Sequence, residues 1–295
     1  MALDIMLPYW GDEAYAREAV ESVRAQTSPD WRLTVVDDAN PDPWMGPWLE
    51  SLGDDRIRYV RKPVNEGITA NFRTCLGLAE SPYLVFLGAD DVLLPNYVEV
   101  VTGAIDRHPG VEIIQPGVQV IDGDGAVQAP LADVVKQRLT MPRGSGERLV
   151  GGEALAASLL AADWMYWPSL VFRTESLRRT PFSDTYEFIQ DLAIVLDQVL
   201  LGARLLIVPT VCFSYRRHAE SASMESLLDD RRFAGEREFF AQYGATMRAR
   251  GWRRAARAAR LHWTSRLHAL TLLPAGVRRG GGAPRALLRH AFGRA

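Results

Sequence analysis

Tyr83-Leu-Val-Phe-Leu-Gly-Ala-Asp90-Asp91 is the most informative stretch of the sequence. Its first five residues are apolar or aromatic, which predicts a buried strand, and the small Gly88 and Ala89 let another group approach the backbone closely. Two carboxylates follow where this strand should end. Burying unpaired charge costs several kcal/mol, so core packing does not explain them, whereas a divalent cation prefers such oxygen ligands. The stretch therefore predicts a sheet strand that ends in a cation site.

Strand and helix patterns alternate along the first part of the chain. We expect strands at 3–7, 31–36, 56–60, 83–87 and 111–116, and helices at 13–26, 69–79 and 97–107. This alternation predicts an α/β fold with a parallel sheet covered by helices on both faces. Sites in such folds lie outside the carboxyl ends of the strands. Asp37 and Asp38, which follow the second strand, should therefore lie near Asp90 and Asp91.

The rest of the chain is less regular. We expect a loop over 128–148, a helix from residue 154, a return to the sheet over 165–172, a helix over 192–201 and a strand over 205–213. Beyond residue 227 the pattern is helical up to a Gly-, Pro- and Arg-rich end.

Composition places the chain among ordinary globular proteins. Of 295 residues, 47% are hydrophobic and 24% are charged. Cys75 and Cys212 both stand in apolar runs, which indicates core thiols rather than a disulfide or metal framework. The sequence opens on a strand pattern instead of a basic and apolar leader, and no apolar run approaches the roughly 20 residues that span a bilayer. We therefore expect a cytoplasmic protein.

Charge is distributed unevenly along the chain. Residues 247–295 contain twelve Arg and no Asp or Glu, so the first 246 residues carry −14 of the net charge of −2. Between Trp252 and Leu273 apolar residues recur at helical spacing, with Arg on the neighbouring face. A basic amphipathic helix with Trp suits an anionic membrane surface. The alternative is a helix packed on the acidic remainder of the chain. No nucleic-acid reading module is present, so we expect no nucleic-acid partner.

Seven short motifs occur in one characteristic order. They are Pro8-Tyr9-Trp10-Gly11, Glu21-Ser22-Val-Arg-Ala-Gln26-Thr27, Val35-Val36-Asp37-Asp38, Asn65-Glu66-Gly67, Gly88-Ala89-Asp90-Asp91, Gln190-Asp191 and Tyr215-Arg216-Arg217-His218. In this order, over residues 3–224, the chain resembles a family 2 glycosyltransferase of GT-A fold. The resemblance implies a Rossmann-like, mostly parallel sheet flanked by helices. It implies a catalytic domain over 1–226, with a nucleotide-sugar half to about residue 116 and an acceptor half after it, and a basic helical extension over 227–295.

The resemblance also implies the ligands. The donor would be a nucleotide-diphosphate sugar of the UDP, dTDP or GDP type, and the cofactor Mg²⁺ or Mn²⁺. The donor-binding residues it implies are Pro8, Tyr9, Asp37, Asp38, Asn65, Gly67, Asn71, Ala89, Asp90 and Arg216. Asp38 would accept a hydrogen bond from the nucleobase, and Asp90, Asp91 and His218 would hold the metal. Gly88 stands where the family has the first acid of its signature, which affects one ribose or metal contact.

Asp191 is the catalytic base that the resemblance implies. Inverting transfer is a single displacement, so one carboxylate must take the proton of the acceptor hydroxyl. The start of a helix favours an ionised carboxylate, although it equally suits a simple helix-terminal acid. Glu187 and Asp197 are rival acids. Trp164, Tyr166 and Trp167 are acceptor candidates because sugars stack on aromatic rings, and core packing explains them equally well.

The expected function is metal-dependent, inverting transfer of a sugar to a hydroxyl of a glycan, a lipid-linked molecule or a small molecule. A membrane-surface location would fit a lipid-linked acceptor. One alternative is a nucleotidyltransferase or pyrophosphorylase, but Pro8-Tyr9-Trp10-Gly11 lacks the basic phosphate loop of that class. Another is a catalytically degenerate nucleotide-sugar-binding protein, suggested by Gly88 and by Gln190, which replaces the family's Glu.

Overall fold

Tyr83–Phe86 forms β4, a central strand of the sheet in the computed structural model. The structure describes residues 1–129, 140–180, 182–186, 189–217, 230–279 and 282–293. Within these residues ten strands make one sheet in the order β3-β2-β1-β4-β9-β6-β10-β5, with β7 on β6 and β8 on β10. The strands other than β4 are β1 Leu3–Tyr9, β2 Trp31–Asp37, β3 Ile57–Arg61, β5 Val92–Leu93, β6 Ile113–Ile121, β7 Val127–Gln128, β8 Arg148–Gly151, β9 Val171–Arg173 and β10 Arg204–Arg216.

Strand direction brings the expected motifs to one edge. The four strands β1 to β4 are parallel, as predicted. β9 runs antiparallel between β4 and β6, and β10 is parallel to β6. β6 and β10 therefore run in the same direction as β4, and the carboxyl end of β10 lies at the same edge as those of β1, β2 and β4. The predicted α/β fold class is confirmed, with antiparallel strands added in the second half.

Helices cover both faces of the sheet. The helices are α1 Glu13–Arg24, α2 Met45–Ser51, α3 Ile68–Leu78, α4 Tyr97–Arg107, α6 Gly152–Ala161, α7 Thr174–Leu177, α8 Gln190–Leu200, α10 Asp230–Ala249, α11 Arg253–Leu261, α12 Trp263–Thr271, α13 Leu273–Arg279 and α14 Ala283–Phe292, with short 3₁₀ turns at Trp167–Ser169 and Asp184–Tyr186. Side chains alternate along β4: Leu84 and Phe86 join a core with α3, α6 and α8, whereas Tyr83 and Val85 join a core with α1 and α4. The strand is therefore buried on both faces, as its continuous apolar pattern predicts.

Local signals set the start of the helices that flank the edge. Asp12 caps α1, because its carboxylate accepts a hydrogen bond from the Tyr15 amide at 3.1 Å. α3 begins directly after Gly67, whose φ of 84° favours glycine. Both helix starts thus follow the loops that leave β1 and β3.

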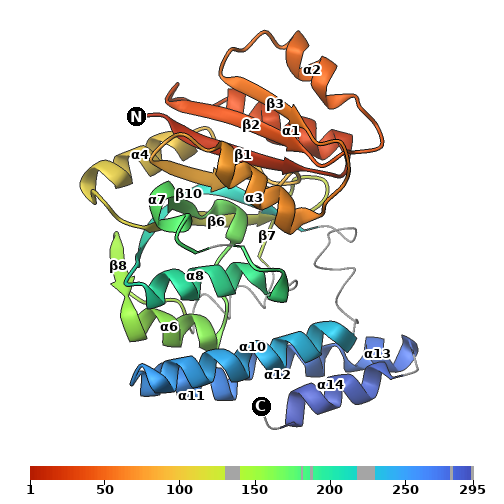
Figure 1. The fold of residues 1–295 in the computed structure, drawn as a ribbon, viewed down its shortest axis with the longest axis vertical. Coiled ribbons are helices and arrows are strands. Elements are labelled where there is room, and N and C mark those ends of the chain that lie inside the picture. Colours follow the sequence, from red (N-terminus) through yellow and green to blue (C-terminus); the bar gives the residue numbers. More distant parts are fainter. Residues whose placement is uncertain (130–139, 181, 187–188, 218–229, 280–281, 294–295) are drawn as a thin grey trace.

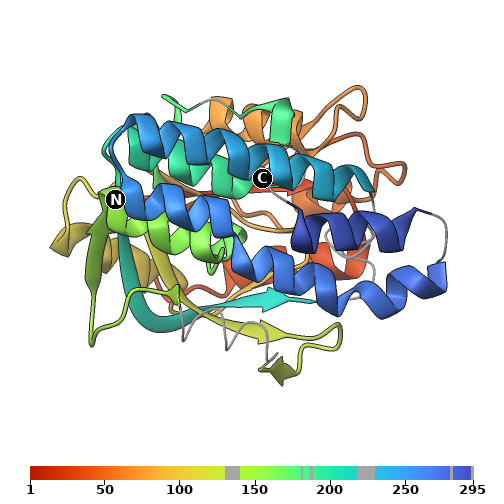
Figure 2. The same ribbon diagram turned by 90° about the horizontal axis from the view of Figure 1, so that it is seen from below.

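The C-terminal helices form a separate layer. α10 and α11 lie against α8 and α6 on the side away from the sheet (Figures 1 and 2). The predicted continuous helix over 252–273 is wrong, because the chain breaks at His262, which has a φ of 24°. Ala256 and Ala259, part of the expected membrane-facing stripe, are buried in the α6–α8–α10 core. In the described part of the chain, no helix combines the length and the hydropathy needed to cross a membrane.

Candidate active site

Asp37, at the end of β2, is a structural brace. It is fully buried, and its carboxylate accepts hydrogen bonds from the Tyr59 hydroxyl at 2.6 Å, the Arg61 guanidinium at 2.7 Å and the Asn40 amide at 2.7 Å. Burial, and then the hydrogen bond to Asp37, raise the pKa of Tyr59 to about 12. These contacts hold Ala39 in the left-handed region at a φ of 56°. Asp37 therefore fixes the turn that leaves β2.

Asp38 organises the loop that carries the Asn65-Glu66-Gly67 motif. Its carboxylate accepts from Lys62 Nζ at 3.1 Å, from the Glu66 amide at 3.1 Å and from the Gly67 amide at 2.8 Å. Both oxygens of Asp38 are thus bonded within the protein. The loop is exposed although Asp38 and Lys62 are buried. The predicted nucleobase contact of Asp38 remains a prediction.

The Pro8-Tyr9-Trp10 turn exposes only its last residue. Pro8 and Tyr9 are buried, and the Tyr9 hydroxyl donates to the Gly11 carbonyl at 3.1 Å while accepting from Trp44 Nε1 at 3.0 Å. Trp10 is 58% exposed at the end of β1. At this strand end the accessible ring is therefore that of Trp10, whereas the predicted donor-binding residue Tyr9 is buried.

Asn71 is buried in the first half of α3. Its Nδ2 donates to the Val36 carbonyl at 2.9 Å, which ties α3 to β2. Its Oδ1 is buried and has no hydrogen-bond partner among the described residues. Asn65 is exposed, and its side chain accepts from the Gly67 amide at 3.0 Å.

Asp91 is an unusual carboxylate. It is 1% exposed, its Oδ1 accepts from the Arg216 amide at 2.9 Å, and its Oδ2 has no partner within the described residues. Burial, and then the charge of Asp90, raise the pKa of Asp91 well above its usual range. A buried carboxylate oxygen without a donor is suited to a cation. Ala89 and Asp90 beside it are partly exposed.

Gly88 makes the position of Asp91 possible. A Cβ at residue 88 would lie 2.4 Å from Asp91 Oδ2 and 3.1 Å from Asp90 Oδ1. Any side chain there would displace the Asp91 carboxylate. The glycine that replaces the first acid of the family signature therefore allows Asp91, its last acid, to adopt this position.

Arg216 is fully engaged with the protein. It is 2% exposed, and its guanidinium donates to the carbonyls of Asp90, Asp122 and Gly123 and to the carboxylate of Glu18. This arrangement braces the Asp90–Asp91 turn against β10. The predicted donor binding by Arg216 would require these bonds to be exchanged. The structure favours the bracing role.

Asp191 lies in the first turn of α8, and its Oδ1 accepts from the Leu192 amide at 2.8 Å. The preceding Gln190 connects α8 to α3, since its Oε1 accepts from Thr69 Oγ1 at 3.3 Å. Thr69 follows Gly67, which Asp38 holds. The motifs after β2 and β3 are thus joined to the start of α8.

Tyr215 brings the three acids together. Burial, followed by the negative charges of Asp91, Asp90 and Asp191, raises the pKa of Tyr215 to about 12. The three carboxylates therefore lie within electrostatic range of the same phenol, and Asp191 exerts the smallest of the three effects. The Asp90–Asp91 turn is also tied to this strand end by the hydrogen bond from the Arg216 amide to Asp91, whereas the link to Asp191, about 100 residues further along the chain, is the effect of its charge on Tyr215.

The third predicted metal ligand, His218, lies outside the described residues. Within the described part of the chain, no group of three or more His, Cys, Asp or Glu side chains is arranged to hold a metal ion. Asp90 and Asp91 are the predicted ligands that the structure describes.

The predicted acceptor aromatics differ in exposure. Trp164 is 3% exposed in the core, and its Nε1 donates to Ser158 Oγ at 2.9 Å, so the core-packing alternative replaces its predicted acceptor role. Tyr166 is also buried, with its ring 5.1 Å from that of Tyr215. Trp167 is partly buried and stacks on Phe86 at 5.8 Å.

Comparison with known proteins identifies the N-terminal half. Residues 4–150 match the model of the family described as glycosyl transferase family 2. Residues 4–150 belong to this family. The family match favours a glycosyltransferase over a pyrophosphorylase.

Two relatives illustrate the similarity of this family 2 domain. O-antigen biosynthesis protein RfbC of Myxococcus xanthus is 32% identical over 125 residues, which are 40% of this chain and 9% of RfbC. Uncharacterized glycosyltransferase MJ1057 of Methanocaldococcus jannaschii is 26% identical over 126 residues, which are 42% of this chain and 43% of that protein. The match therefore spans less than half of each relative.

The fold is similar to that of a solved structure. The crystal structure of S. aureus TarS 1-349 in complex with UDP-GlcNAc superposes with a TM-score of 0.63 and 17% identity, and the match covers 82% of this chain and 66% of that one. At this identity the similarity concerns the fold.

Four features of the site were not predicted from the sequence: the exposed Trp10, the buried Lys62, the link from Thr69 to Gln190, and the role of Tyr215 as the residue between the acids. Lys62 had a signal, because it is one of two lysines in the chain. The Thr69 link joins positions 121 residues apart, which no local pattern indicates.

Proposed function

We propose that the protein is a metal-dependent, inverting glycosyltransferase that moves a sugar from a nucleotide-diphosphate donor to an acceptor hydroxyl. The observation that carries this proposal is the buried, donor-free Oδ2 of Asp91 beside Asp90 at the carboxyl edge of the sheet, with Asp191 within electrostatic range of the same Tyr215 phenol. It gives one edge of the sheet both a cation-binding pair and a separate carboxylate able to act as a base. The family 2 domain supports the same activity.

The donor is proposed to be a UDP sugar, because TarS, of similar fold, was crystallised with UDP-GlcNAc. The nucleoside would lie outside the ends of β1 and β2, with Trp10 beside the base and the Asp38-organised loop next to it. dTDP and GDP sugars are the alternatives that the same edge could accommodate.

Asp90 and Asp91 fit a divalent cation, since Asp91 Oδ2 is buried without a donor and Asp90 is adjacent and partly exposed. These two residues would hold Mg²⁺ or Mn²⁺, with His218 as a further candidate ligand. Bound there, the cation would offset the negative charge that develops on the departing diphosphate. Gly88 keeps the Asp91 carboxylate in place for this purpose.

Asp191 would act on the acceptor. Its carboxylate takes the proton from the acceptor hydroxyl as the oxygen bonds to the anomeric carbon of the donor sugar. The bond between that carbon and the diphosphate oxygen breaks in the same displacement, so the configuration inverts. Gln190 and Thr69 position the first turn of α8 that presents Asp191.

Asp191→Asn tests this assignment. We expect transfer to fall by about 10²- to 10⁴-fold, the usual loss for a general base, while Mn²⁺-dependent stabilisation by the donor stays near that of the wild type. A thermal-shift screen of nucleotide sugars with Mn²⁺ identifies the donor, since a ligand at 100 times its Kd stabilises by about 2.7 kcal/mol. Asp184→Asn, which changes an exposed acid paired with Arg73, is the matched control. Retained turnover in Asp191→Asn would remove this residue from the mechanism.

The C-terminal helices are proposed to contact an anionic membrane surface and so to bring a lipid-linked acceptor to the site. Leu267, Val277, Leu288 and Phe292 on α12 to α14 are 43% to 71% exposed. The surrounding sequence contains Arg and no acid. Exposed apolar side chains in a basic segment have the chemistry of an interfacial anchor. A peripheral position on the inner face of the membrane would follow.

A further inference from the structure

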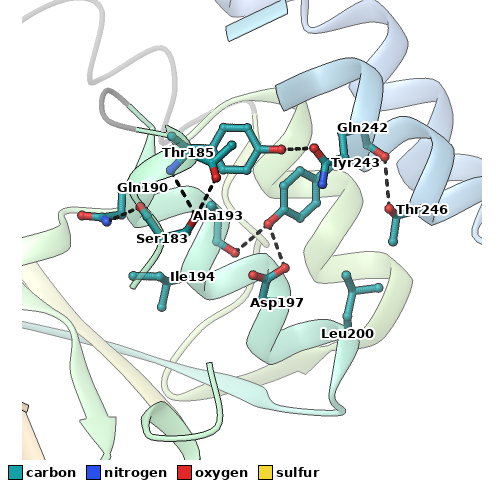
Figure 3. Close-up of a pocket in the computed structure, with 11 residues that line it drawn as sticks. Ser183, Thr185, Gln190, Ala193, Ile194, Asp197, Leu200, Gln242, Tyr243 and Thr246 are labelled. Carbon is teal, nitrogen blue, oxygen red and sulfur yellow. Dashed lines mark hydrogen bonds between the residues drawn. The ribbon is translucent and has the colours of Figure 1, made fainter. Parts of the chain in front are cut away.

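A cavity of about 220 Å³ lies between α8 and α10, and its lining includes neither Asp90 nor Asp91 (Figure 3). Its polar lining consists of Ser183, Thr185, Gln190, Asp197, Gln242 and Thr246. Two tyrosines and three apolar residues complete the lining. Pockets that enclose drug-sized ligands have roughly 300–1,000 Å³, so this one suits a single small unit.

The lining points to a neutral, hydroxyl-rich ligand. Among the described residues that line the cavity none is basic, which disfavours phosphate and other anions. Hydroxyl, amide and carboxylate groups are close together, so the space is too polar for an apolar molecule. Sugar hydroxyls both donate and accept hydrogen bonds, and they therefore match a wall of mixed donors and acceptors.

Asp197 is the strongest acceptor in this wall. Its Oδ1 accepts from the Tyr243 hydroxyl at 2.8 Å, whereas the described residues provide no donor to its Oδ2. Burial raises the pKa of Asp197, and the hydrogen bond from Tyr243 opposes the shift. A ligand hydroxyl that donates to Oδ2 would satisfy the second oxygen. Figure 3 shows this carboxylate facing the Tyr243 hydroxyl from α8.

Gln242 offers the complementary group. Its Oε1 accepts from the Tyr186 hydroxyl, which leaves the amide Nε2 to donate. Tyr186 and Tyr243 present aromatic rings at the same wall, a surface on which the C–H face of a sugar can pack. The acceptor Asp197 thus comes from α8, the donor Gln242 from α10, and the two rings from α10 and from the turn before α8.

The cavity and Asp191 share the same helix. Gln190 lines the cavity, and Asp191 is the next residue, about 100° around α8. Asp197 lies six residues further on, or about 9 Å along the helix axis. A molecule with two or more linked sugar units could therefore occupy the cavity and reach Asp191.

We propose that this cavity is a carbohydrate subsite that holds a neutral sugar unit of the acceptor beside the one that reacts. This inference rests on the proposed glycosyltransferase function. It names the class of acceptor as a neutral glycan whose non-reacting unit binds between α8 and α10.

Saturation-transfer difference NMR on the full chain tests the proposal, with a panel of methyl glycosides of neutral hexoses and N-acetylhexosamines as probes. We expect signals for at least one glycoside with the wild type. Asp197→Asn keeps an oxygen for Tyr243 but loses the charge, and Thr246→Phe fills the cavity from α10. Both should weaken glycoside binding about tenfold or more, as expected on losing a hydrogen bond to a charged group or the space itself. Asp106→Asn, an exposed acid on α4, is the matched control and should bind as the wild type does.

Donor binding separates the two proposals. In all three variants, thermal stabilisation by nucleotide sugar and Mn²⁺ should equal that of the wild type, because none of the residues proposed to bind the donor or the cation lines the cavity. Donor stabilisation without any glycoside signal, or glycoside signals unchanged in both cavity variants, would overturn the subsite and leave the glycosyltransferase proposal intact. If nucleotide sugar and Mn²⁺ do not stabilise the wild type, the glycosyltransferase proposal is contradicted. Glycoside signals that both cavity variants weaken would still support a carbohydrate site.

Discussion

Asp91 and Gly88 illustrate how one residue permits another. Asp91 is buried with one unpaired oxygen, at a site where an ionised carboxylate is costly unless a cation compensates. It occupies the space that a side chain at residue 88 would need. Gly88, which departs from the family signature, therefore leaves the room that the Asp91 carboxylate needs.

Gly88→Ala should be destabilising for this reason. The new methyl group would collide with Asp91 Oδ2, and overpacking of this kind costs about 1–3 kcal/mol. Urea unfolding measures the change in the free energy of unfolding. Gly77→Ala is the control, because a Cβ there meets nothing within 4 Å and alanine favours the helix α3. Equal stability of the two variants would contradict the proposed contact.

At the scale of residues, the sequence predicted where the charged site candidates lie, but it did not predict their hydrogen-bond partners. Asp37, Asp38, Asp90 and Asp91 stand at the predicted edge because strand ends are local signals. The partners of Arg216 were not predictable, since Glu18 lies 198 residues away. Burial of Tyr9 and Trp164 also depends on neighbours that only the folded chain brings together.

Elements are joined across the site by a few side-chain bonds. α3 contacts β2 through Asn71 and α8 through Thr69, so the loop after β3 and the start of α8 have a fixed relation. The spacing of apolar residues predicted these strands and helices, because those residues pack into the two cores that cover the faces of one sheet. The break at His262 was not predicted, since the pattern over 252–273 remains helical and only tertiary packing requires the chain to turn.

The C-terminal helices should respond to acid through two buried histidines. Burial lowers the pKa of His290 to about 4, although the charge of Glu236 opposes the shift, and burial also lowers the pKa of His262. The unfolded chain then binds more protons below a pH of about 6.5, so stability present above this pH is lost as the pH falls toward 4. We expect a loss of up to about 3 kcal/mol from His290.

Urea unfolding between these pH values measures this loss. His290→Gln should flatten the pH dependence, and His268→Gln, an exposed position on α12, should not. If the free energy of unfolding depends on pH equally in the His290→Gln variant and in the wild type, this histidine does not titrate on unfolding.

On the scale of the whole molecule, charge and hydrophobicity are separated. The acidic body contains the sheet and the site, and α11, in the basic segment 247–295, lies against α6 on the side away from the sheet (Figure 2). This separation was visible in the sequence. Which apolar residues remain exposed was not, because the stripe predicted to face a membrane is partly buried against α10.

Leu267→Ser combined with Phe292→Ser tests the membrane proposal. Both side chains are exposed, and removing them should weaken sedimentation with phosphatidylglycerol-containing vesicles about tenfold or more. Binding should also fall as salt is raised. Val127→Ser, at an exposed valine outside the basic helices, is the control and should bind as the wild type does. Unchanged sedimentation of the double variant would count against a membrane-facing role of these helices.

The central claim is that Asp90 and Asp91 hold a divalent cation at the carboxyl edge of the sheet and that Asp191, distant in sequence, lies beside it. The most direct test is paramagnetic broadening of backbone amide signals by Mn²⁺ with UDP present. We predict that signals of residues 89–91, 190–192 and 215–217 broaden together, that those of α14 do not, and that Asp91→Asn removes the effect. Broadening at only one of these segments, or at sites scattered over the surface, would contradict the claim.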